Sequence, residues 1–397
     1  MRTMSETMAQ LAAFGARQGS LHMPGSSPSR LESLADFGSN PGRLRAHGYC
    51  PAGLAKKAPL VVVLHGCKQN AGDYDHRSGW SQLADLAGFA LLYPEQSPGN
   101  NPNLCFNWFR PGDTRRDSGE ALSIRQMIDA MIAAHGLDRD RVFVTGLSAG
   151  GAMANVMLAT YPEVFAGGAI IAGLAYGCAS SVPEAFDCMR GQAPASDEEL
   201  WAQLRQASPH AGPWPRVAIW QGMADHTVAP SNAEDIAAQW RTAHRLDDAP
   251  TREEISGGRM RRIWSNRAGE AVIELNTVAA MGHGTPLASD LGAPGPYMLD
   301  VGISSTREIA AFWGIAEDAA RTGSAQNVPP KSVSPKSVSP KLAPRSGPAA
   351  KTPLAAPPPR TSGATVKADP ASPTSPAAVS RIKDVIEQAL RAAGLMK

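Results

Sequence analysis

Short apolar runs alternate with helix-like segments through the middle of this chain, and this alternation limits its possible folds most strongly. The runs are four to eight residues long, the length of buried strands. Strands that alternate with helices form a mostly parallel sheet with helices on both faces. The sequence therefore predicts an α/β fold. Core strands are expected at 60–64, 89–93, 141–145, 169–172, 216–220 and 271–278, helices at 118–135, 152–161 and 232–244, and an edge strand at 43–49.

The composition changes near residue 318 and separates a body from a tail. From there to the end the chain has 12 Lys+Arg and 4 Asp+Glu, so the tail carries +8 and the body −6 of the overall +2. The tail holds 13 of the 33 prolines, and no Phe, Trp or Tyr follows Trp313. Such a segment cannot bury enough apolar surface to offset its ordering entropy, so a disordered tail is predicted.

Four segments follow from these patterns. Residues 1–42 are expected to form an amphipathic segment and a loop, and residues 43–317 the catalytic domain. A disordered linker rich in Pro, Ala and Lys is expected at 318–379. Apolar residues at helical spacing predict an amphipathic helix at 380–397.

The charge and hydropathy of the chain exclude several classes of partner. An acidic body disfavours nucleic acid as the ligand of the folded domain. No run approaches the roughly 20 apolar residues of a membrane span. The N-terminus lacks a sustained apolar stretch, which favours a cytoplasmic protein without a signal peptide and leaves secretion open. The oligomeric state is left open.

The five cysteines are Cys50, Cys67, Cys105, Cys178 and Cys188. None belongs to a CxxC pair, so no metal site is expected. An odd count in a chain without a signal peptide favours reduced thiols. Two pairs, Cys67 with Cys105 and Cys178 with Cys188, could still form disulfides in an oxidising compartment.

A G-x-S-x-G pattern at 146–150 follows one predicted strand and begins a helix. This strand–turn–helix setting is typical of a nucleophilic serine on a tight turn. Ser148 is therefore the candidate nucleophile. The alternative is a glycine-rich helix start that packs or binds an anion.

A nucleophilic serine needs a base and an orienting acid, which follow it in the order Asp or Glu, then His. Asp225 comes just after the predicted strand at 216–220, and His283 lies between two glycines after the last strand. We predict Asp225 as the acid and His283 as the base. The alternatives are His226 as base and Asp300 or Asp235 as acid.

The oxyanion formed in such a reaction needs hydrogen-bond donors. The backbone N–H of Ala149, directly after the nucleophile, is one candidate. The loop Leu64-His65-Gly66-Cys67 follows an early strand, so the N–H of Cys67 is the second. His65 is expected to pack and hydrogen-bond beneath the site.

Taken together, these motifs resemble esterases of the polyhydroxybutyrate depolymerase family. The resemblance covers about residues 43–315, and the specific feature is the order of HGC, Asn-Trp-Phe and GLSAGG. It rests on VVVLHGCKQN, FALLYPEQ, CFNWF, VFVTGLSAGGAMA, GMADHTV and MGHGT.

The resemblance implies an α/β-hydrolase fold and hydrolysis of carboxylic esters without a cofactor. It implies that Ser148, Asp225 and His283 form the triad, that Cys67 lies beside the oxyanion hole, and that Asn107 and Trp108 bind substrate. The alternative for Trp108 is a core aromatic. The expected substrate is a poly- or oligo-(3-hydroxybutyrate) ester.

Other functions remain open. The same family is similar to feruloyl and acetylxylan esterases, and the triad also suits a peptidase or thioesterase. A protein of another class would bind polyanions or polymer granules through its basic tail.

Overall fold

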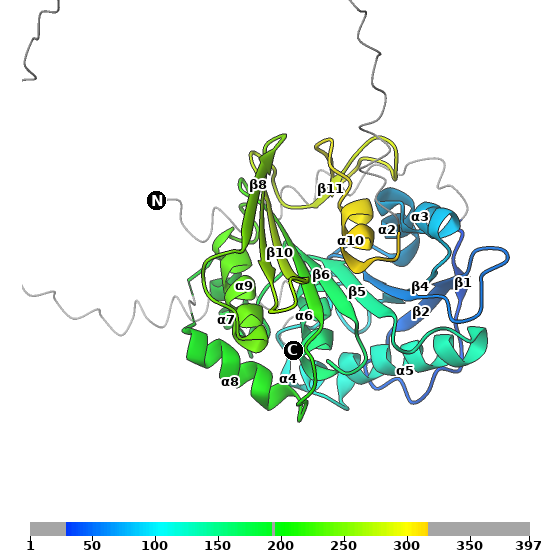
Figure 1. Ribbon diagram of the computed structural model, residues 1–397. Helices are drawn as coiled ribbons and strands as arrows, with labels where there is room; N and C mark the ends of the chain where they lie inside the picture. The colour runs from blue at the N-terminus through cyan, green and yellow to red at the C-terminus, as the bar shows by residue number, and fades with distance from the viewer. Residues whose placement is uncertain (1–28, 193–194, 317–397) are drawn as a thin grey trace, which may run out of the picture. The chain divides into compact units, whose positions relative to one another are not determined.

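The computed structural model describes residues 29–192 and 195–316, which form a central sheet between two layers of helices (Figure 1). The sheet has ten strands in the order β1-β2-β4-β3-β5-β6-β7-β10-β9-β8. In chain order they are β1 (Glu32–Ser33), β2 (Arg45–Tyr49), β3 (Leu60–Leu64), β4 (Ala90–Glu95), β5 (Val142–Leu147), β6 (Gly167–Ile171), β7 (Arg216–Gly222), β8 (Arg252–Ser256), β9 (Arg259–Ser265) and β10 (Ala271–Val278).

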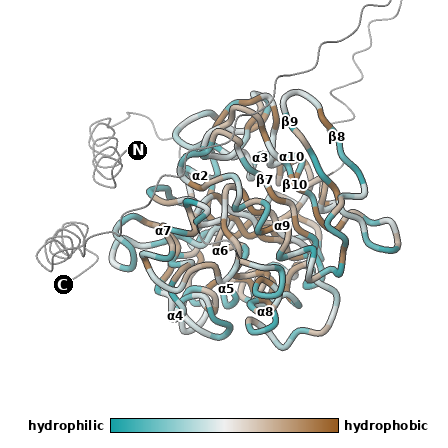
Figure 2. Tube along the Cα trace, turned by 90° about the vertical axis from the view of Figure 1, so that its left-hand side faces the viewer, coloured by the Kyte–Doolittle hydropathy of each residue, from teal (hydrophilic) through white to brown (hydrophobic). Residues whose placement is uncertain are grey.

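The six central strands, β4, β3, β5, β6, β7 and β10, are parallel. They are continuous apolar runs because both faces of the sheet are covered. On β3, Leu60, Val62 and Leu64 pack into one core cluster, while Val61 and Val63 pack into the other. This alternation is the period of a strand, and it divides the interior into two cores. Figure 2 shows hydrophobic residues concentrated in the interior, including β7 and β10.

Helices cover the two faces of the sheet (Figure 1). The first core cluster includes residues of α5 (Gly119–His135), α6 (Ala149–Thr160), α8 (Asp197–Ala207) and α9 (Ser231–His244). The second includes residues of α2 (Ala71–Ser78), α3 (Trp80–Ala87) and α10 (Ser305–Trp313). Shorter elements connect these layers: α4 (Pro111–Thr114), α7 (Val182–Met189) and a small parallel pair, β11 (Thr285–Leu287) and β12 (Met298–Asp300).

The predicted mostly parallel sheet with helices on both faces is confirmed. The strands that were not predicted are β1, β8, β9, β11 and β12; of these, β8 and β9 form an antiparallel hairpin that extends the sheet beside β10. The strand expected at the edge, β2, lies one place inside it, because β1 pairs with its outer side. Glu32 and Ser33, within the segment expected to be a loop, therefore contribute to the sheet.

Several predictions fall on parts of the chain outside the described residues. These are the amphipathic segment within residues 1–28, the disordered linker and the C-terminal helix. Within the residues that are described, no helix is both long and apolar enough to cross a membrane.

The parallel strands place the functional loops. The carboxyl ends of β3, β5, β6, β7 and β10 meet at one edge of the sheet, where folds of this kind place ligands. The loops that carry His65, Ser148, Asp225 and His283 follow four of these strands. Residues far apart in the sequence are thereby brought to one edge.

Candidate active site

Ser148 occupies the turn between β5 and α6 in a conformation that few residues with a side chain adopt. Its φ is 57° and its ψ is −118°, so the backbone is strained at this residue. Its backbone N–H donates to the Ile171 carbonyl at the end of β6, 2.9 Å away. This bond ties the turn to the neighbouring strand. It is the strand–turn–helix geometry expected of a nucleophile elbow.

The glycines around Ser148 allow the turn to pack closely. A Cβ at Gly146 would lie 2.3 Å from the Gly150 carbonyl oxygen. A Cβ at Gly150 would lie 2.3 Å from the Leu64 carbonyl oxygen of β3. Both would collide with backbone, which cannot yield as a flexible side chain can. The motif glycines therefore let α6 start directly against the central strands.

Asp225 is a buried carboxylate held by its own loop. Its Oδ1 accepts hydrogen bonds from the backbone N–H groups of Thr227 and Val228, at 2.8 and 2.9 Å. Its Oδ2 accepts a bond of 3.2 Å from the Gln221 amide of β7. Burial raises the pKa of Asp225, but the bonds from His283, Val228 and Thr227 outweigh it and hold the pKa below its ordinary value. The acid is therefore kept ionised and fixed in position.

His283 is hydrogen-bonded to that carboxylate. Its Nδ1 lies 2.7 Å from Asp225 Oδ2, although 58 residues separate the two in sequence. The approach is close because Gly222 has no side chain: a Cβ there would lie 2.4 Å from the Gly282 carbonyl oxygen. The carboxylate thus fixes the ring so that Nε2 is the nitrogen left for other chemistry.

The loop that carries His283 is held at both of its ends. At one end it packs on Gly222 of β7, and at the other the Thr285 hydroxyl lies 3.3 Å from the Tyr74 hydroxyl of α2. Helix α2 follows β3, and β5 lies between β3 and β7 in the sheet. The loop therefore runs from the β7 side of the sheet toward the helix that follows β3. In this structure the His283 ring is hydrogen-bonded to Asp225.

The alternative acids and base lie elsewhere. His226 is exposed, and its neighbour Asp225 bonds to His283 instead. Asp300 is exposed on β12, and Asp235 lies on α9. Among the residues described, Asp225 is the carboxylate that the fold brings to His283.

The loop after β3 is held from beneath by His65, which is buried. His65 Nδ1 lies 2.8 Å from the Gly66 carbonyl oxygen, and Nε2 accepts from the Gln96 backbone N–H at 3.1 Å. Burial lowers the pKa of His65, which keeps the ring neutral with one donor and one acceptor. The neighbouring N–H groups of Gly66 and Lys68 are bonded to Gln69 and Asn103. The His65 ring and the backbone N–H groups of Gly66 and Lys68 are therefore already hydrogen-bonded. None of them competes with the Cys67 backbone N–H as the expected oxyanion donor.

Two disulfides correct the expectation of reduced thiols. The structure joins Cys67 to Cys105 and Cys178 to Cys188, with Cα atoms 4.2 and 6.2 Å apart. Cys50 is the unpaired cysteine of the described chain. These are the two pairs that the sequence left open as the alternative to reduced thiols; the odd count favoured thiols, whereas pairing depends on which loops the fold brings together. The first bridge links the loop of the candidate oxyanion hole to the loop before Trp108.

Asn107 and Trp108 differ in their surroundings. Asn107 is fully buried, and its amide nitrogen donates to Glu120 at 2.7 Å while its oxygen accepts from Asn101 at 3.1 Å. Trp108 keeps 9% of its surface exposed and packs edge-on against Phe109. Trp108 is therefore the one of the two with a surface available to a ligand.

Sequence reasoning missed Glu120, a buried acid in the first turn of α5. A signal was present: Glu120 is four residues before Ile124 on the buried side of that helix. A carboxylate on an apolar helix face indicates a buried hydrogen-bond network. Elsewhere in the described chain, no three His, Cys, Asp or Glu side chains gather as metal ligands would.

Comparisons with known proteins agree with this architecture. The family model described as "Esterase PHB depolymerase" matches residues 45–260. Poly(3-hydroxyalkanoate) depolymerase C of Paucimonas lemoignei is 44% identical over 74% of this chain and 72% of its own length. Feruloyl esterase B of Neurospora crassa is 37% identical over 53% of this chain and 73% of its own.

A solved structure shows the same fold. The acetyl xylan esterase from Aspergillus awamori aligns with a TM-score of 0.63 and 27% identity. The alignment covers 74% of this chain and all of that enzyme. Fold, site and relatives together define a carboxylic ester hydrolase of the α/β-hydrolase class. Within that class, the chain belongs to the PHB depolymerase family of esterases.

Proposed function

We propose that Ser148, His283 and Asp225 form the catalytic triad of this esterase. The observation that carries the proposal is the 2.7 Å bond between His283 Nδ1 and a buried Asp225. A charged acid bonded to one ring nitrogen leaves the other to act as a base. The positive φ of Ser148 supports its role as nucleophile, since strain of this kind is typical of functional turns.

The proposed reaction has two halves. Ser148 Oγ attacks the ester carbonyl carbon, and its proton passes to His283 Nε2. The imidazolium then protonates the leaving alcohol as the acyl-enzyme forms. Water, deprotonated by His283, hydrolyses the acyl-enzyme and releases the acid. Asp225 stabilises the imidazolium in both halves.

Two backbone amides are proposed to bind the oxyanion. Ala149 is the first residue of α6, and N–H groups in the first turn of a helix have no acceptor within the helix. The Cys67 N–H donates to no backbone or side-chain acceptor in the described chain. The disulfide to Cys105 and the bonds of His65 hold this loop still, which favours a preorganised donor pair.

Substitution of the serine tests the triad. We expect Ser148→Ala to lower kcat for p-nitrophenyl butyrate by at least about a thousandfold, because the reaction loses its nucleophile. Ser256→Ala, an exposed serine on β8, is the matched control and should keep wild-type kinetics. Circular dichroism should show all three proteins folded. Turnover by Ser148→Ala within tenfold of the wild type would refute the triad.

The proposed substrate is a poly- or oligo-(3-hydroxybutyrate) ester. The relative of that type shares 44% of its aligned residues with this chain, more than the feruloyl and acetylxylan esterases do. Trp108 is proposed to line the acyl pocket, while Asn107, being buried, acts on substrate only through the placement of Trp108. The alternative is a feruloyl- or acetylxylan-type esterase, which the relatives with those names favour.

A substrate panel separates these possibilities. Purified protein is offered hydroxybutyrate polymer, hydroxybutyrate trimer, methyl ferulate, acetylated xylan and a peptide. Mass analysis of the products should show hydroxybutyrate units with the highest kcat/KM among the esters. A kcat/KM at least tenfold higher for ferulate or acetyl xylan would instead support the alternative.

The two disulfides support an oxidising compartment in place of the cytoplasm. Protein purified from its natural host without reductant and denatured in a maleimide reagent should carry one label, on Cys50. Five labels would contradict this proposal.

A further inference from the structure

Glu120 is the most unusual buried group outside the proposed triad. It lies in the first turn of α5, fully buried, and its carboxylate accepts four N–H bonds. The donors are Gln96 Nε2 at 2.7 Å, Asn100 Nδ2 at 3.1 Å, Asn107 Nδ2 at 2.7 Å and the Asn107 backbone at 2.8 Å. All four are uncharged amides, so the carboxylate is held by hydrogen bonds.

Two of these bonds hold Asn107, the residue before Trp108. The backbone N–H of Asn107 donates to Oε2 and its side chain donates to Oε1. Its remaining side-chain atom, Oδ1, accepts from Asn101. Main chain and side chain are both fixed, so the position of Trp108 follows from that of Glu120.

The other two bonds fix the carboxylate itself. Gln96 Nε2 and Asn100 Nδ2 both donate to Oε1, which orients Oε2 toward the Asn107 backbone. Gln96 also donates its backbone N–H to His65, which holds the loop of the proposed oxyanion hole. The hydrogen-bond network around Glu120 thus contacts both the loop that carries Trp108 and the loop after β3.

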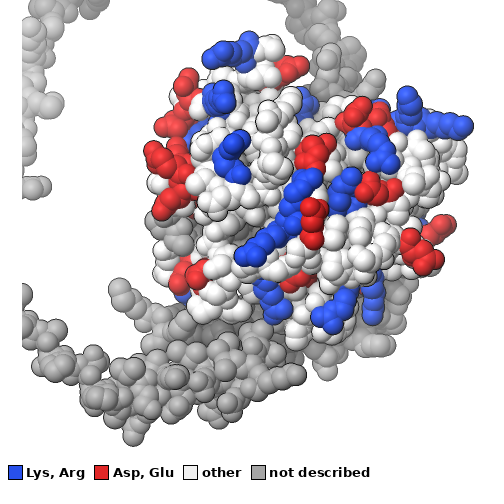
Figure 3. Space-filling model, turned by 90° about the horizontal axis from the view of Figure 1, so that it is seen from below, with Lys and Arg blue, Asp and Glu red and all other residues white. Residues whose placement is uncertain are grey.

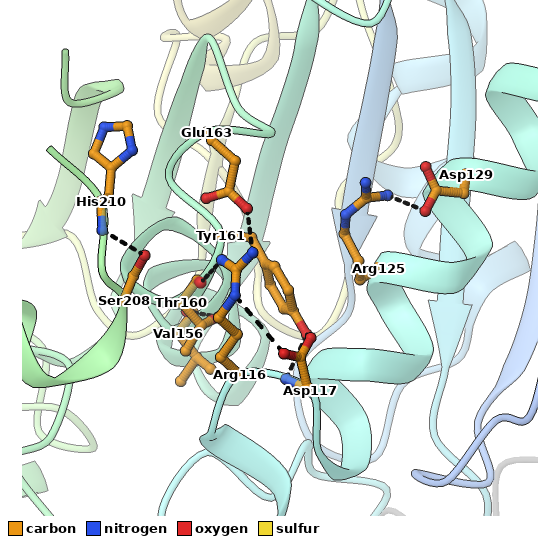
Figure 4. A network of polar contacts seen from close by, with 10 residues as sticks. All are labelled: Arg116, Asp117, Arg125, Asp129, Val156, Thr160, Tyr161, Glu163, Ser208 and His210. Carbon is orange, nitrogen blue, oxygen red and sulfur yellow. Dashed lines mark hydrogen bonds and ion pairs between the residues drawn. The ribbon is translucent and has the colours of Figure 1, made fainter. Parts of the chain in front are cut away.

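The start of α5 is anchored independently of Glu120. Arg116 donates to the Thr160 carbonyl at the end of α6 and to Glu163, both at 2.7 Å (Figure 4). The Tyr161 hydroxyl accepts the Asp117 backbone N–H at 2.7 Å. Residues 116–118 are therefore held against α6 whatever side chain stands at 120. A substitution of Glu120 should leave this anchor in place.

Burial makes a carboxyl costly at this position. Burial, followed by repulsion from Asp113, raises the pKa of Glu120 to about 8, against the effect of its amide donors. An apolar residue would avoid that cost. The acid is consistent with a role in arranging its partners rather than in stabilising the fold.

We propose that Glu120 is a positioning residue, which places Trp108 in the acyl pocket through its two hydrogen bonds to Asn107. The inference rests on the proposed esterase site, and in particular on Trp108 lining it. Glu120 itself does not touch the reacting atoms.

The test uses Glu120→Gln in the full chain, assayed well above pH 8, where the carboxyl group of the wild type is ionised. The Gln amide keeps one oxygen for the donors on Oε1 but turns an NH2 group toward the Asn107 backbone N–H. That bond is lost, and Trp108 should shift. We expect KM for p-nitrophenyl butyrate to rise on the order of tenfold with kcat within about threefold, since pocket contacts are lost and the triad is untouched.

Asp75→Asn is the matched control. Asp75 is also buried and accepts bonds from the Ser81 backbone, the Ser81 hydroxyl and the Tyr93 hydroxyl. Its helix, α2, packs in the other core cluster and holds no part of the Trp108 loop. The control should lose stability in urea while KM stays at the wild-type value. Equal stability losses in both variants with wild-type KM in both would overturn the proposal.

The single variant Asn107→Ala keeps the proposal testable if Glu120→Gln folds poorly, and a double-mutant cycle adds a second test where both variants fold. Asn107→Ala removes one of the two bonds and leaves the carboxylate in place, and we expect KM to rise on its own. The double variant should be no worse than the worse single variant, because both act through one loop. A wild-type KM for Asn107→Ala, or additive effects, would contradict the proposal. Because p-nitrophenyl butyrate is a small soluble ester, these results do not depend on whether the protein acts on a polymer. Ser148→Ala tests the proposed triad separately.

Discussion

At the scale of single residues, the site depends on one buried charge placed beside one ring. Asp225 lies in a loop that donates two backbone N–H groups to it, so it remains ionised despite burial. In the proposed triad, His283 needs that charge only while its ring is positively charged, which is during each proton transfer. Substitution of Asp225 should thus lower kcat far more than it changes KM.

Substitution of the acid tests this reading. Asp225→Asn keeps the shape but offers an N–H where His283 needs an acceptor, and we expect kcat for p-nitrophenyl butyrate to fall about 10⁴-fold with a small change in KM. Asp300→Asn, an exposed acid on β12, is the control and should keep wild-type kcat. A similar loss in both variants, or a loss in Asp300→Asn alone, would contradict the assignment of the acid.

The sequence indicated the proposed triad because each member has a local signature. Ser148 lies in G-x-S-x-G, and Asp225 and His283 each follow an apolar run. The role of Glu120 could not be predicted in the same way. Its four hydrogen-bond donors belong to Gln96, Asn100 and Asn107, which only the folded chain brings together. Buried networks of this kind depend on tertiary contacts, which periodicity does not describe.

At the scale of elements, one carboxylate holds the start of α2. Glu95 at the end of β4 accepts the backbone N–H of Ala71 at 2.9 Å and lies near His47 of β2. Burial alone would raise the pKa of Glu95, but His47 and the Ala71 amide lower it to about 2. The charged form is therefore favoured in the folded state.

This shift predicts how stability depends on pH. A folded pKa below the unfolded value of about 4.3 gives stability that is present above that pH and is lost as the pH falls toward 2. Glu95→Gln should be less stable than the wild type by about 1–3 kcal/mol at pH 6. The difference should vanish near pH 2. Urea unfolding at both pH values measures this, with the exposed Glu253→Gln as control. A constant difference at both pH values would contradict it.

The disulfide between Cys67 and Cys105 joins two loops separated by 38 residues. Cys105→Ser should lower the free energy of unfolding by about 2–5 kcal/mol, because the unfolded chain gains freedom. Cys50→Ser, at the unpaired cysteine, should change it by less than about 1 kcal/mol. Urea unfolding without reductant measures both. Equal effects would indicate that the bridge does not form.

The central strands were predictable and the hairpin was not, for a physical reason. The central strands are covered on both faces, so each is an uninterrupted apolar run. Strand β8 lies at the sheet edge with four of its five residues exposed, and its sequence, REEIS, has no buried stripe. Its position is set by pairing with β9, which composition does not reveal.

At the scale of the whole molecule, α10, the last helix of the described chain, packs into a core cluster. Trp313 at the end of α10 stacks on Trp80 and Phe143, with ring centroids 5.9 and 4.9 Å away. On the face seen in Figure 3, acidic and basic side chains are interspersed and form no single basic patch. The fold-class prediction came from the strand and helix pattern. The strand order, and whether the two candidate cysteine pairs form disulfides, could not be predicted because both depend on long-range contacts.

Removal of the tail tests how far activity depends on it. A chain ending at residue 317 should keep kcat/KM for p-nitrophenyl butyrate within about twofold, since the described core is intact. Sedimentation with hydroxybutyrate granules and with heparin compares the two chains, because the tail carries +8 by sequence. Retained activity with lost sedimentation would support a tethering role. A loss of activity above tenfold would contradict an independent catalytic body.

The central claim is that Ser148 is the nucleophile, and covalent labelling tests it most directly. The protein is inactivated with a p-nitrophenyl phosphonate, which reacts with activated serines, and the adduct is mapped by peptide mass spectrometry. We predict one adduct per chain, on Ser148, formed in step with the loss of activity, and none in Ser148→Ala. An adduct on another residue in step with inactivation, or labelling of Ser148→Ala at the wild-type rate, would contradict the claim.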